Sequence, residues 1–518
     1  MGDIRKNFHL ILLILSFVGI VDSVYLTYEH YAPSSHIICP EFSIIDCGKV
    51  IKGPYSEIYG IPLSILGLIF YLFFFVLIFL IKKYQVRVFK YFAILSSSFA
   101  FLFSIYLVYL QLFVIGAICI YCMLSALTST SLFIISLNYF EEERKGLVAI
   151  KVGWLYRNIF KKMFFMIDAE IVHENMLSFG ELSGRSNLIK KITEFFFLHN
   201  DKILSQKIVD INFERPIGLA AGFDYEAKLT QFLPSLGFGF ATVGTITNLP
   251  YEGNPKPRLG RLPNSKSLLV NKGFKNEGAE VIAKKLSKLE FNYAQGVSIG
   301  RSNSEKLDSQ KKSVDDVVSA FKTFEKNKVG NKYYELNISC PNLIHGNVDF
   351  YNPNNLDELL SKVGNLKIKK PILIKMPIEK SDREVLAMLK VIVKHKIAGV
   401  IFGNLQKDRK HKSLVKEEVN KFKMGFFSGK PTFERSNELI KLAYKKFGKK
   451  LVIIGCGGVF SAEDAYTKIK LGASLIQLIT GLIYQGPQLV SEINLGLLDL
   501  LKKDEYKNIS EAEGVDSK

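Results

Sequence analysis

Apolar residues are distributed unevenly along this chain of 518 residues. Four long, nearly unbroken apolar runs lie within the first 140 residues, near Phe8–Tyr28, Ile61–Ile81, Tyr91–Phe113 and Ile115–Leu137. Each run is long enough to cross the hydrocarbon core of a bilayer as a helix, which takes about 20 residues. The pattern predicts a four-helix transmembrane bundle over residues 1–140.

The first run also has a feature of a signal peptide, because Arg5 and Lys6 precede it. It lacks an Ala-x-Ala-like cleavage site and three more spans follow, which favours a retained helix. Lys and Arg also fill the turn between the second and third spans, whereas the loop from Glu29 to Gly60 holds only two lysines. The positive-inside rule then predicts a multi-pass protein of the cell inner (cytoplasmic) membrane, with both termini and everything after Glu141 in the cytoplasm.

Residues 141–205 have an amphipathic, charged pattern. In Leu155–Asp168 large apolar side chains recur at helical spacing with cations between them. Such a segment is either a plain linker helix packed on the next domain or a helix lying in the membrane interface. We treat it as a separate connector.

From residue 206 to 505, short apolar runs alternate with helical patterns. The runs are Phe240–Thr245, Gly296–Ile299, Tyr334–Ile338, Ile372–Lys375, Gly399–Phe402, Leu451–Ile454 and Leu475–Ile479. This alternation predicts an α/β fold, a (β/α)8 TIM barrel, in which chemistry gathers at the carboxyl ends of the strands. Residues 506–518 are predicted to be a disordered tail.

The net charge of +19 raises the question of nucleic-acid binding. Its lysines are spread along the chain, and the sequence carries no basic-aromatic module or recognisable reader motif. Attraction to anionic lipid explains the cations beside the membrane better. We therefore expect no nucleic-acid partner.

Four of the six cysteines, Cys39, Cys47, Cys119 and Cys122, fall in the membrane part. The predicted topology puts all four at the extracytoplasmic face, where disulfides persist. A Cys-x-x-Cys pair on the first turn of a helix can close a disulfide and exchange it quickly, because the helix terminus lowers a thiol pKa. Zinc binding with His36 and plain buried thiols are the alternatives; we expect no metal.

From about Arg5 to Phe140 the sequence resembles the vitamin K epoxide reductase family. The matching features are the loop pair Cys39 and Cys47, then Gly60-Ile-Pro-Leu-Ser64, then Cys119-x-x-Cys122. The resemblance implies that Cys119 or Cys122 reacts with a membrane quinone inside the bundle. It also implies that Cys39 and Cys47 relay electrons from an extracytoplasmic thioredoxin-like thiol protein. A serine usual in the family is missing near Gly53 and Pro54.

Over roughly Leu155 to Leu501 the sequence resembles the dihydroorotate dehydrogenases, flavin enzymes of pyrimidine biosynthesis. The motifs that carry the resemblance are Gly218-Leu-Ala-Ala-Gly-Phe-Asp224, Gly253-Asn-Pro-Lys-Pro-Arg258, Asn337-Ile-Ser-Cys-Pro-Asn342, Ile374-Lys-Met376, Gly455-Cys-Gly-Gly458 and Gly481-Leu-Ile-Tyr-Gln-Gly-Pro487. Asp168-Ala-Glu170 with His173 is similar to the entry segment of the quinone-using members, in which a helical extension leads quinone to the flavin. The connector would then form this quinone tunnel.

The resemblance implies FMN as cofactor. The implied contacts are Ala221, Gly222, Thr245, Asn337, Lys375, Gly429, Gly457, Gly458, Thr480 and Gly481. Gly455-Cys-Gly-Gly458 and Thr480-Gly481 fall after the last two predicted strands, where such a barrel binds phosphate. Either motif alone could be an ordinary turn.

The same resemblance assigns the substrate and the base. Asn271, Gly273, Phe274, Asn342 and Asn404 would surround a dihydroorotate-like substrate, since amides both donate and accept hydrogen bonds. Cys340 would take a proton from it, and Lys375 would place a cation by the flavin. A lone cysteine is also compatible with a small core residue.

Several positions depart from the family pattern. Serine usually stands where Cys340 is in the membrane-type enzymes. Tyr225 replaces an expected lysine, Ser298 an asparagine, and Leu405 a threonine, which bears on substrate specificity.

The sequence thus predicts a quinone-dependent dihydroorotate dehydrogenase fused to a disulfide-forming quinone reductase. The alternatives are an FMN oxidoreductase of another substrate on the same barrel, and a non-catalytic barrel that anchors the membrane module.

Overall fold

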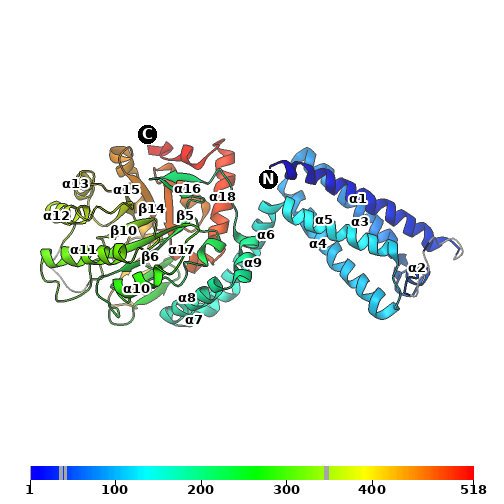
Figure 1. Ribbon diagram of the computed structural model, residues 1–518, viewed down its shortest axis with the longest axis horizontal. Coiled ribbons are helices and arrows are strands. Elements are labelled where there is room, and N and C mark those ends of the chain that lie inside the picture. The colour runs from blue at the N-terminus through cyan, green and yellow to red at the C-terminus, as the bar shows by residue number, and fades with distance from the viewer. Residues whose placement is uncertain (1, 34–38, 40–43, 344–348, 518) are drawn as a thin grey trace. The chain divides into compact units, whose positions relative to one another are not determined.

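The computed structural model describes residues 2–33, 39, 44–343 and 349–517, with side chains from residue 7 onward. The chain divides into two compact units, Met1–Leu147 and Val148–Lys518. Figure 1 shows their elements, and each unit is described by itself. His36, the alternative zinc ligand, lies outside the described residues.

The first unit is built from four long apolar helices. They are α1 (Gly2–Tyr31), α3 (Leu63–Tyr84), α4 (Arg87–Tyr109) and α5 (Ile120–Tyr139). A π-helical turn, Leu110–Ile115, extends α4. All four are long and apolar enough to cross a membrane, as predicted.

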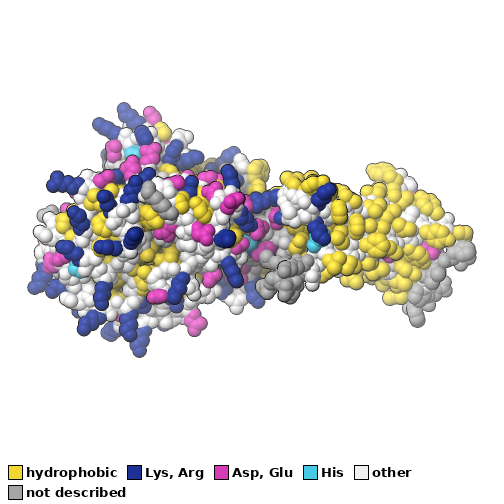
Figure 2. Space-filling view, turned by 90° about the horizontal axis from the view of Figure 1, so that it is seen from above, with side chains coloured by type: hydrophobic (Ala, Val, Ile, Leu, Met, Phe, Trp, Pro, Cys, Tyr) yellow, Lys and Arg dark blue, Asp and Glu magenta, His cyan; other side chains and the backbone are white. Residues whose placement is uncertain are grey.

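The bundle has apolar side chains on its outside as well as in its core. Leu12, Phe74 and Ile78 are fully buried between helices. Phe99 and Phe113, by contrast, are 69% and 74% exposed, and Figure 2 shows an apolar surface over this unit. An exterior of this kind is stable in lipid and costly in water.

Short elements close one end of the bundle. They are α2 (Cys47–Ile51) and a hairpin of β1 (Glu57–Ile58) with β2 (Ile61–Pro62). Asp46 caps α2, because its carboxylate accepts a hydrogen bond from the Lys49 N–H at 2.9 Å.

The second unit is a closed barrel of eight parallel strands, which confirms the predicted fold. The strands, in barrel order, are β5 (Ile217–Leu219), β6 (Phe240–Ile246), β9 (Ala294–Gly300), β10 (Tyr333–Asn337), β11 (Ile372–Met376), β12 (Gly399–Phe402), β14 (Val452–Cys456) and β15 (Leu475–Leu478). Nearly every strand residue is buried, as expected for a parallel sheet covered on both faces.

Helices surround this barrel (Figure 1). They are α10 (Ala279–Leu286), α11 (Gln310–Lys326), α12 (Pro353–Gly364), α13 (Asp382–Ile392), α15 (Phe433–Phe447), α16 (Ala462–Lys470) and α18 (Leu489–Lys503), with short α14 (Lys416–Val419) and α17 (Thr480–Gln485). A small antiparallel sheet of β7 (Leu259–Leu262), β8 (Ser267–Val270) and β13 (Phe426–Phe427) is inserted in the loops. The hairpin of β3 (Gln206–Ile208) and β4 (Ile211–Phe213) precedes β5.

The connector is helical throughout most of its length. It contains α6 (Glu141–Leu155), a π-helical turn at Tyr156–Phe160, α7 (Lys161–Met166), α8 (Ala169–Arg185) and α9 (Asn187–Phe197). The boundary between the two units falls inside α6. Asp168 caps α8 by accepting from the Glu170 and Ile171 N–H groups.

The predicted disordered tail was wrong. Residues 506–517 pack on the second unit and contain two 3-10 turns, Ile509–Ala512 and Val515–Ser517. Ile509 is 1% exposed, and its N–H donates to the Ile203 carbonyl at 2.8 Å. The polar composition concealed two well-spaced apolar anchors, Ile509 and Ala512, which give the segment a buried face.

Candidate active sites

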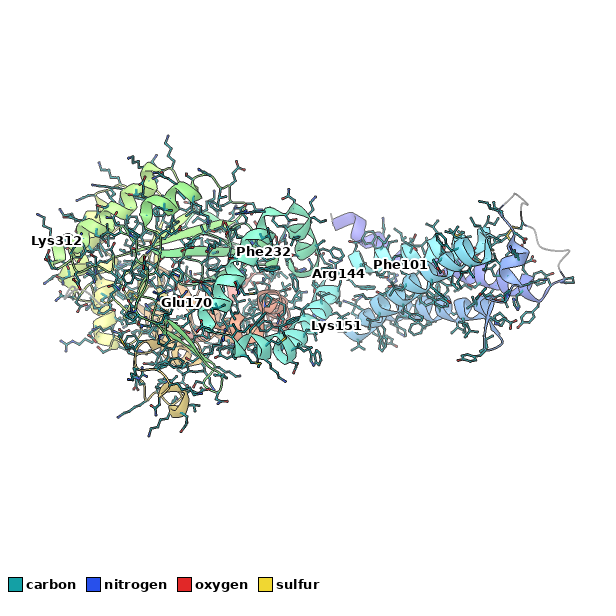
Figure 3. The ribbon with its side chains drawn as sticks, turned by 90° about the horizontal axis from the view of Figure 1, so that it is seen from below. Phe101, Arg144, Lys151, Glu170, Phe232 and Lys312 are labelled. Carbon is teal, nitrogen blue, oxygen red and sulfur yellow. A yellow bond between two sulfur atoms is a disulfide. The ribbon has the colours of Figure 1, made fainter. Side chains whose placement is uncertain are left out.

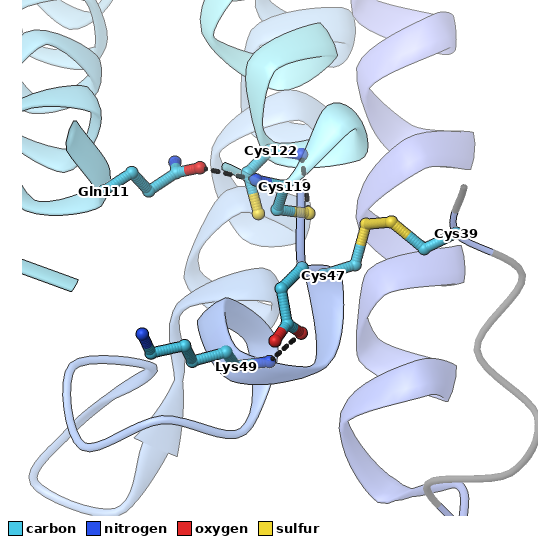
Figure 4. The surroundings of a disulfide bond; sticks show 7 residues. Cys39, Cys47, Lys49, Gln111, Cys119 and Cys122 are labelled. Carbon is cyan, nitrogen blue, oxygen red and sulfur yellow. Dashed lines mark hydrogen bonds between the residues drawn. A yellow bond between two sulfur atoms is a disulfide. The ribbon is translucent and has the colours of Figure 1, made fainter. Parts of the chain in front are cut away.

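The membrane unit brings the four predicted cysteines together. Cys39 and Cys47 form a disulfide, whereas Cys119 and Cys122 are free thiols. All four belong to one apolar cluster that also contains Leu26 (Figure 4). Thiol–disulfide exchange requires a thiolate to approach a disulfide sulfur, and this clustering provides the proximity.

Main-chain pairing explains why the two cysteine pairs meet. Ile45 and Ile118 form a parallel β-bridge, in which the Ile118 N–H donates to the Ile44 carbonyl and the Asp46 N–H to the Ile118 carbonyl. Cys47 and Cys119 follow these two segments directly. Cysteines far apart in the sequence are therefore brought to the same place by backbone hydrogen bonds.

Cys119 is the N-cap of α5. Its sulfur accepts from the Cys122 N–H at 3.3 Å, and its own N–H donates to the Gln111 amide oxygen at 2.9 Å (Figure 4). Gln111 is only 4% exposed. Sequence reasoning missed Gln111, although a polar amide within an apolar span is itself a signal.

The barrel unit contains a cavity of about 890 Å³ at the carboxyl ends of its strands. It is lined by all ten predicted flavin-binding residues and by Cys340, Gly273, Phe274, Asn342 and Asn404. Asn271 is the one predicted site residue of this unit that does not line it. The same cavity extends between the connector helices.

Glycines bring the main chain to the cavity surface after β14. Gly457 has a φ of +98°, and an added Cβ would lie 2.4 Å from the Thr432 hydroxyl. Gly458 has a φ of +70°, and its Cβ would lie 2.5 Å from Phe433. Only glycine fits such positions without strain. Thr480 begins α17 nearby, and its hydroxyl bonds to Ser428 at 2.8 Å.

Neighbouring strands place Asn337 and Lys375 side by side. The two residues pair in register at the ends of β10 and β11. Lys375 is 5% exposed, and its ammonium lies 3.5 Å from the Ala221 carbonyl. The Asn337 amide donates to Thr245 at 2.8 Å, and Thr245 bonds to Ser298 at 2.9 Å. Ser298, a departure from the family pattern, thus supports a cavity-lining hydroxyl.

Cys340 lies in the loop after β10 and lines the cavity. Burial raises the pKa of the Cys340 thiol to about 12. A hydrogen bond from the Asn342 N–H and the charges of nearby cations, with Lys375 the strongest of these, act in the opposite direction. The thiol is therefore protonated near neutral pH in the absence of a ligand, and a base at this position must first lose its proton.

Asn254, which sequence reasoning missed, holds the loops around the cavity together. It is 1% exposed, and its amide nitrogen donates to the Asn271 side chain at 3.0 Å and to the Asn342 carbonyl at 2.9 Å. Its oxygen accepts from Tyr251 at 2.7 Å. The Asn271 amide is thus engaged by Asn254. In the sequence, Asn254 is distinguished only as the second residue of the Gly253–Arg258 motif.

The connector forms the apolar end of the cavity. Its lining includes Val152, Leu155, Phe160, Phe164, Met176 and Phe179. Gly180 of α8 faces Leu229 and Phe232, because a Cβ there would meet both side chains; Figure 3 labels Phe232. Burial, followed by the charge of Lys272, lowers the pKa of His173 to about 3, so this imidazole is neutral.

Tyr225 and Lys272 face one another at the cavity wall. Both line the cavity, and the Lys272 ammonium lies 4.9 Å from the centre of the Tyr225 ring. Neither residue was assigned a role from the sequence.

Comparison with known proteins identifies both units. Residues 203–501 match the family model described as "Dihydroorotate dehydrogenase", and residues 10–137 match the "Vitamin K epoxide reductase family". A "Dihydroorotate dehydrogenase (quinone)" of Trichodesmium erythraeum is 36% identical over 389 residues, covering 70% of this chain and all of that protein. The enzyme of that name from Nitratiruptor is 37% identical over 357 residues, covering 69% and 98%.

A solved structure agrees with these matches. The crystal structure of "DHODH in complex with ferulenol from Eimeria tenella" superposes with a TM-score of 0.59 at 25% identity. The match covers 67% of this chain and 96% of that one. The chain belongs to the dihydroorotate dehydrogenase family, and its first unit belongs to the vitamin K epoxide reductase family.

Proposed function

We propose that the barrel unit oxidises dihydroorotate to orotate with FMN and a membrane quinone, and that the membrane unit couples thiol oxidation to quinone reduction. The observation that carries the proposal is the shape of the barrel cavity. One cavity combines a polar set of amides, a thiol and a lysine with an apolar passage between the connector helices.

The residues present fit FMN. Gly457 and Gly458 line the cavity with positive φ, and Thr432 and Phe433 leave no room for a Cβ there, so only glycine lets the main-chain amides face a phosphate at this place. Lys375 provides a buried cation, and Asn337 and Thr245 provide polar groups. Held by these residues, FMN would supply a hydride acceptor for the substrate and a two-electron donor for the quinone.

The protein's own groups handle the substrate and its proton. Asn342 and Asn404 line the cavity with amide groups that can bind a cyclic imide. Asn404 also donates to the Ser339 carbonyl at 2.7 Å, which holds the loop before Cys340. Cys340 takes the proton from the dihydro carbon as a thiolate and holds it as a thiol.

Apolar helices support a quinone as the second substrate. Phe179, Leu182 and Leu188 of α8 and α9 are more than 60% exposed, which suits a helix pair resting in a membrane interface. Arg261 lies with its guanidinium 4.9 Å from the Phe165 ring at the cavity wall. We assign the connector to the quinone passage.

In the membrane unit, electrons pass from a thiol partner to quinone. A dithiol of an extracytoplasmic thioredoxin-like protein reduces the Cys39–Cys47 disulfide and becomes a disulfide itself. The Cys39 and Cys47 thiols then reduce a Cys119–Cys122 disulfide by exchange. Finally, the Cys119 and Cys122 thiols give two electrons and two protons to a quinone, which becomes a quinol.

A second candidate keeps the same barrel with a different substrate. Tyr225 and Leu405 both line the cavity where the family pattern has lysine and threonine. These replacements favour testing related cyclic substrates beside dihydroorotate.

The test uses the full-length protein purified in detergent. We expect a yellow flavin spectrum that dihydroorotate bleaches in the absence of oxygen and that a short-chain quinone restores. A flavin that dihydroorotate leaves oxidised would contradict the proposed substrate.

A further inference from the structure

Lys272 is a buried cation on the wall of the barrel cavity. It follows β8 and Asn271, it is 4% exposed, and its side chain lines the cavity. Taking an ammonium group out of water is costly unless an anion or several acceptors replace the lost hydration. The partner of Lys272 is therefore informative.

The nearby carboxylates are bound by other cations. Glu170 of α8 pairs with Arg258 at 3.4 Å, and Glu174 pairs with Lys275 at 3.0 Å. The contact found for the Lys272 ammonium among the described residues is the face of the Tyr225 ring, 4.9 Å away. An aromatic face attracts a cation but satisfies none of its three N–H donors.

The position of Lys272 points to the substrate end of the cavity. Its carbonyl accepts from the Asn254 N–H, and the Asn254 side chain binds the Asn342 carbonyl at 2.9 Å. Burial, followed by the charge of Cys340, raises the pKa of Tyr225, so the Tyr225 ring lies within electrostatic reach of that thiol. Lys272 thus belongs to the surroundings of Cys340 and Asn342.

We propose that Lys272, held against Tyr225, is the cation that binds the carboxylate of the substrate. It takes over the charge that the family pattern places at position 225. The inference rests on the proposed function, because it requires an anionic substrate of the dihydroorotate type. It makes Lys272 a residue that determines specificity for acids over neutral rings.

The protonation of Lys272 predicts how the affinity for a carboxylate changes with pH. Burial lowers the pKa of Lys272 to about 8, so that the group stays mostly charged at neutral pH. The charged groups that face it are Glu170 and Glu174, which raise its pKa, and Lys275 and Arg258, which lower it; the neutral groups are Tyr225 and His173. Carboxylate affinity is full below this pKa and decreases above it, by about tenfold for each further pH unit.

The experiment titrates the oxidised full-length protein in detergent with orotate and follows the visible flavin band. Orotate carries the same carboxylate but undergoes no turnover. We expect K272M to keep its flavin and bind orotate about ten- to a hundredfold more weakly, the usual effect of losing a charged hydrogen-bond partner. K272R should keep most of the affinity. Lys284→Met, which removes an exposed lysine paired with Glu280 on α10 and away from the cavity lining, is the matched control and should bind as the parent does.

The pH profile of the parent needs no substitution, so it tests the inference even if K272M fails to fold. Orotate affinity should decrease above pH about 8 in the parent, and K272R should move that decrease to higher pH. Equal orotate affinity in K272M and the parent, or a parent profile flat to pH 10, overturns the role of Lys272 while dihydroorotate still bleaches the flavin. If neither dihydroorotate nor orotate changes the parent spectrum, the proposed function itself is wrong and the inference with it.

Discussion

The two units obtain a reactive site in different ways. In the membrane unit, four cysteines from two short sequence segments meet in one apolar cluster. In the barrel unit, the cavity residues come from many short runs spread along the chain between Val152 and Pro487. A site concentrated in two motifs depends on a few covalent groups, whereas a dispersed site depends on a scaffold that holds many weak contacts at once.

The largest expected effect separates the two chemistries. Replacing both thiols, Cys119→Ala/Cys122→Ala, should abolish quinone-dependent disulfide formation in a reduced partner, because no dithiol remains to reduce quinone. Dihydroorotate-dependent flavin bleaching and its reversal by quinone should stay at the parent rate. Cys39→Ala is the companion variant: it should block transfer from the partner while a small dithiol reductant still drives quinone reduction. Loss of flavin reoxidation in the double variant would show that the two chemistries are coupled.

The proton acceptor of the barrel is the next test. Cys340→Ala should slow flavin reduction by about 10²–10⁴-fold, the usual range for a lost general base. Cys340→Ser should keep a measurable rate, because a hydroxyl can also exchange a proton there. At saturating dihydroorotate the parent rate should increase with pH, since burial raises the Cys340 pKa and only the thiolate accepts the proton. Stopped-flow absorbance measures all three; an unchanged rate in Cys340→Ala would assign the proton to another group.

A smaller effect tests whether the dispersed site depends on its scaffold. Asn254→Ala removes hydrogen bonds to Asn271, to the Asn342 carbonyl and to Tyr251. We expect the KM for dihydroorotate to increase about tenfold or more, since each buried partner left unsatisfied costs about 1–3 kcal/mol. Thiol oxidation should not change. Steady-state kinetics on both reactions measures this difference, and a KM within twofold of the parent would contradict it.

The smallest expected effect concerns the connector. Asp168→Ala removes the cap of α8 and should destabilise that helix by about 1 kcal/mol. We expect a modest increase in the KM for quinone and a smaller change in the KM for dihydroorotate, because most α8 residues that line the cavity are apolar. Equal changes in both constants would mean that the connector also shapes the substrate end.

Local patterns predicted much of this molecule. Long apolar runs predicted the four helices, and the alternation of short apolar runs with helical patterns predicted the barrel. Both patterns could be recognised because they arise from burial within single elements. What escaped prediction depends on contacts between distant segments. Asn254 is an ordinary loop asparagine until Asn271 and Asn342 fold onto it. The nearby carboxylates, Glu170 and Glu174, pair with Arg258 and Lys275 rather than with Lys272, which only the folded structure shows. The tail was misjudged because Ile509 and Ala512 find their partners only on the finished barrel.

The β-bridge between Ile45 and Ile118 sets a rule for how this protein can vary. Main-chain hydrogen bonds do not depend on the side chains that the bridge carries, so Ile45 and Ile118 can be exchanged for other residues of β propensity. Chain length between the bridge and the cysteines is a different matter, because successive residues in extended backbone point to opposite sides. One residue inserted between Ile118 and Cys119 would turn that thiol away from the disulfide. Substitutions in this region should therefore be tolerated, whereas insertions or deletions between the bridge and the cysteines should abolish exchange.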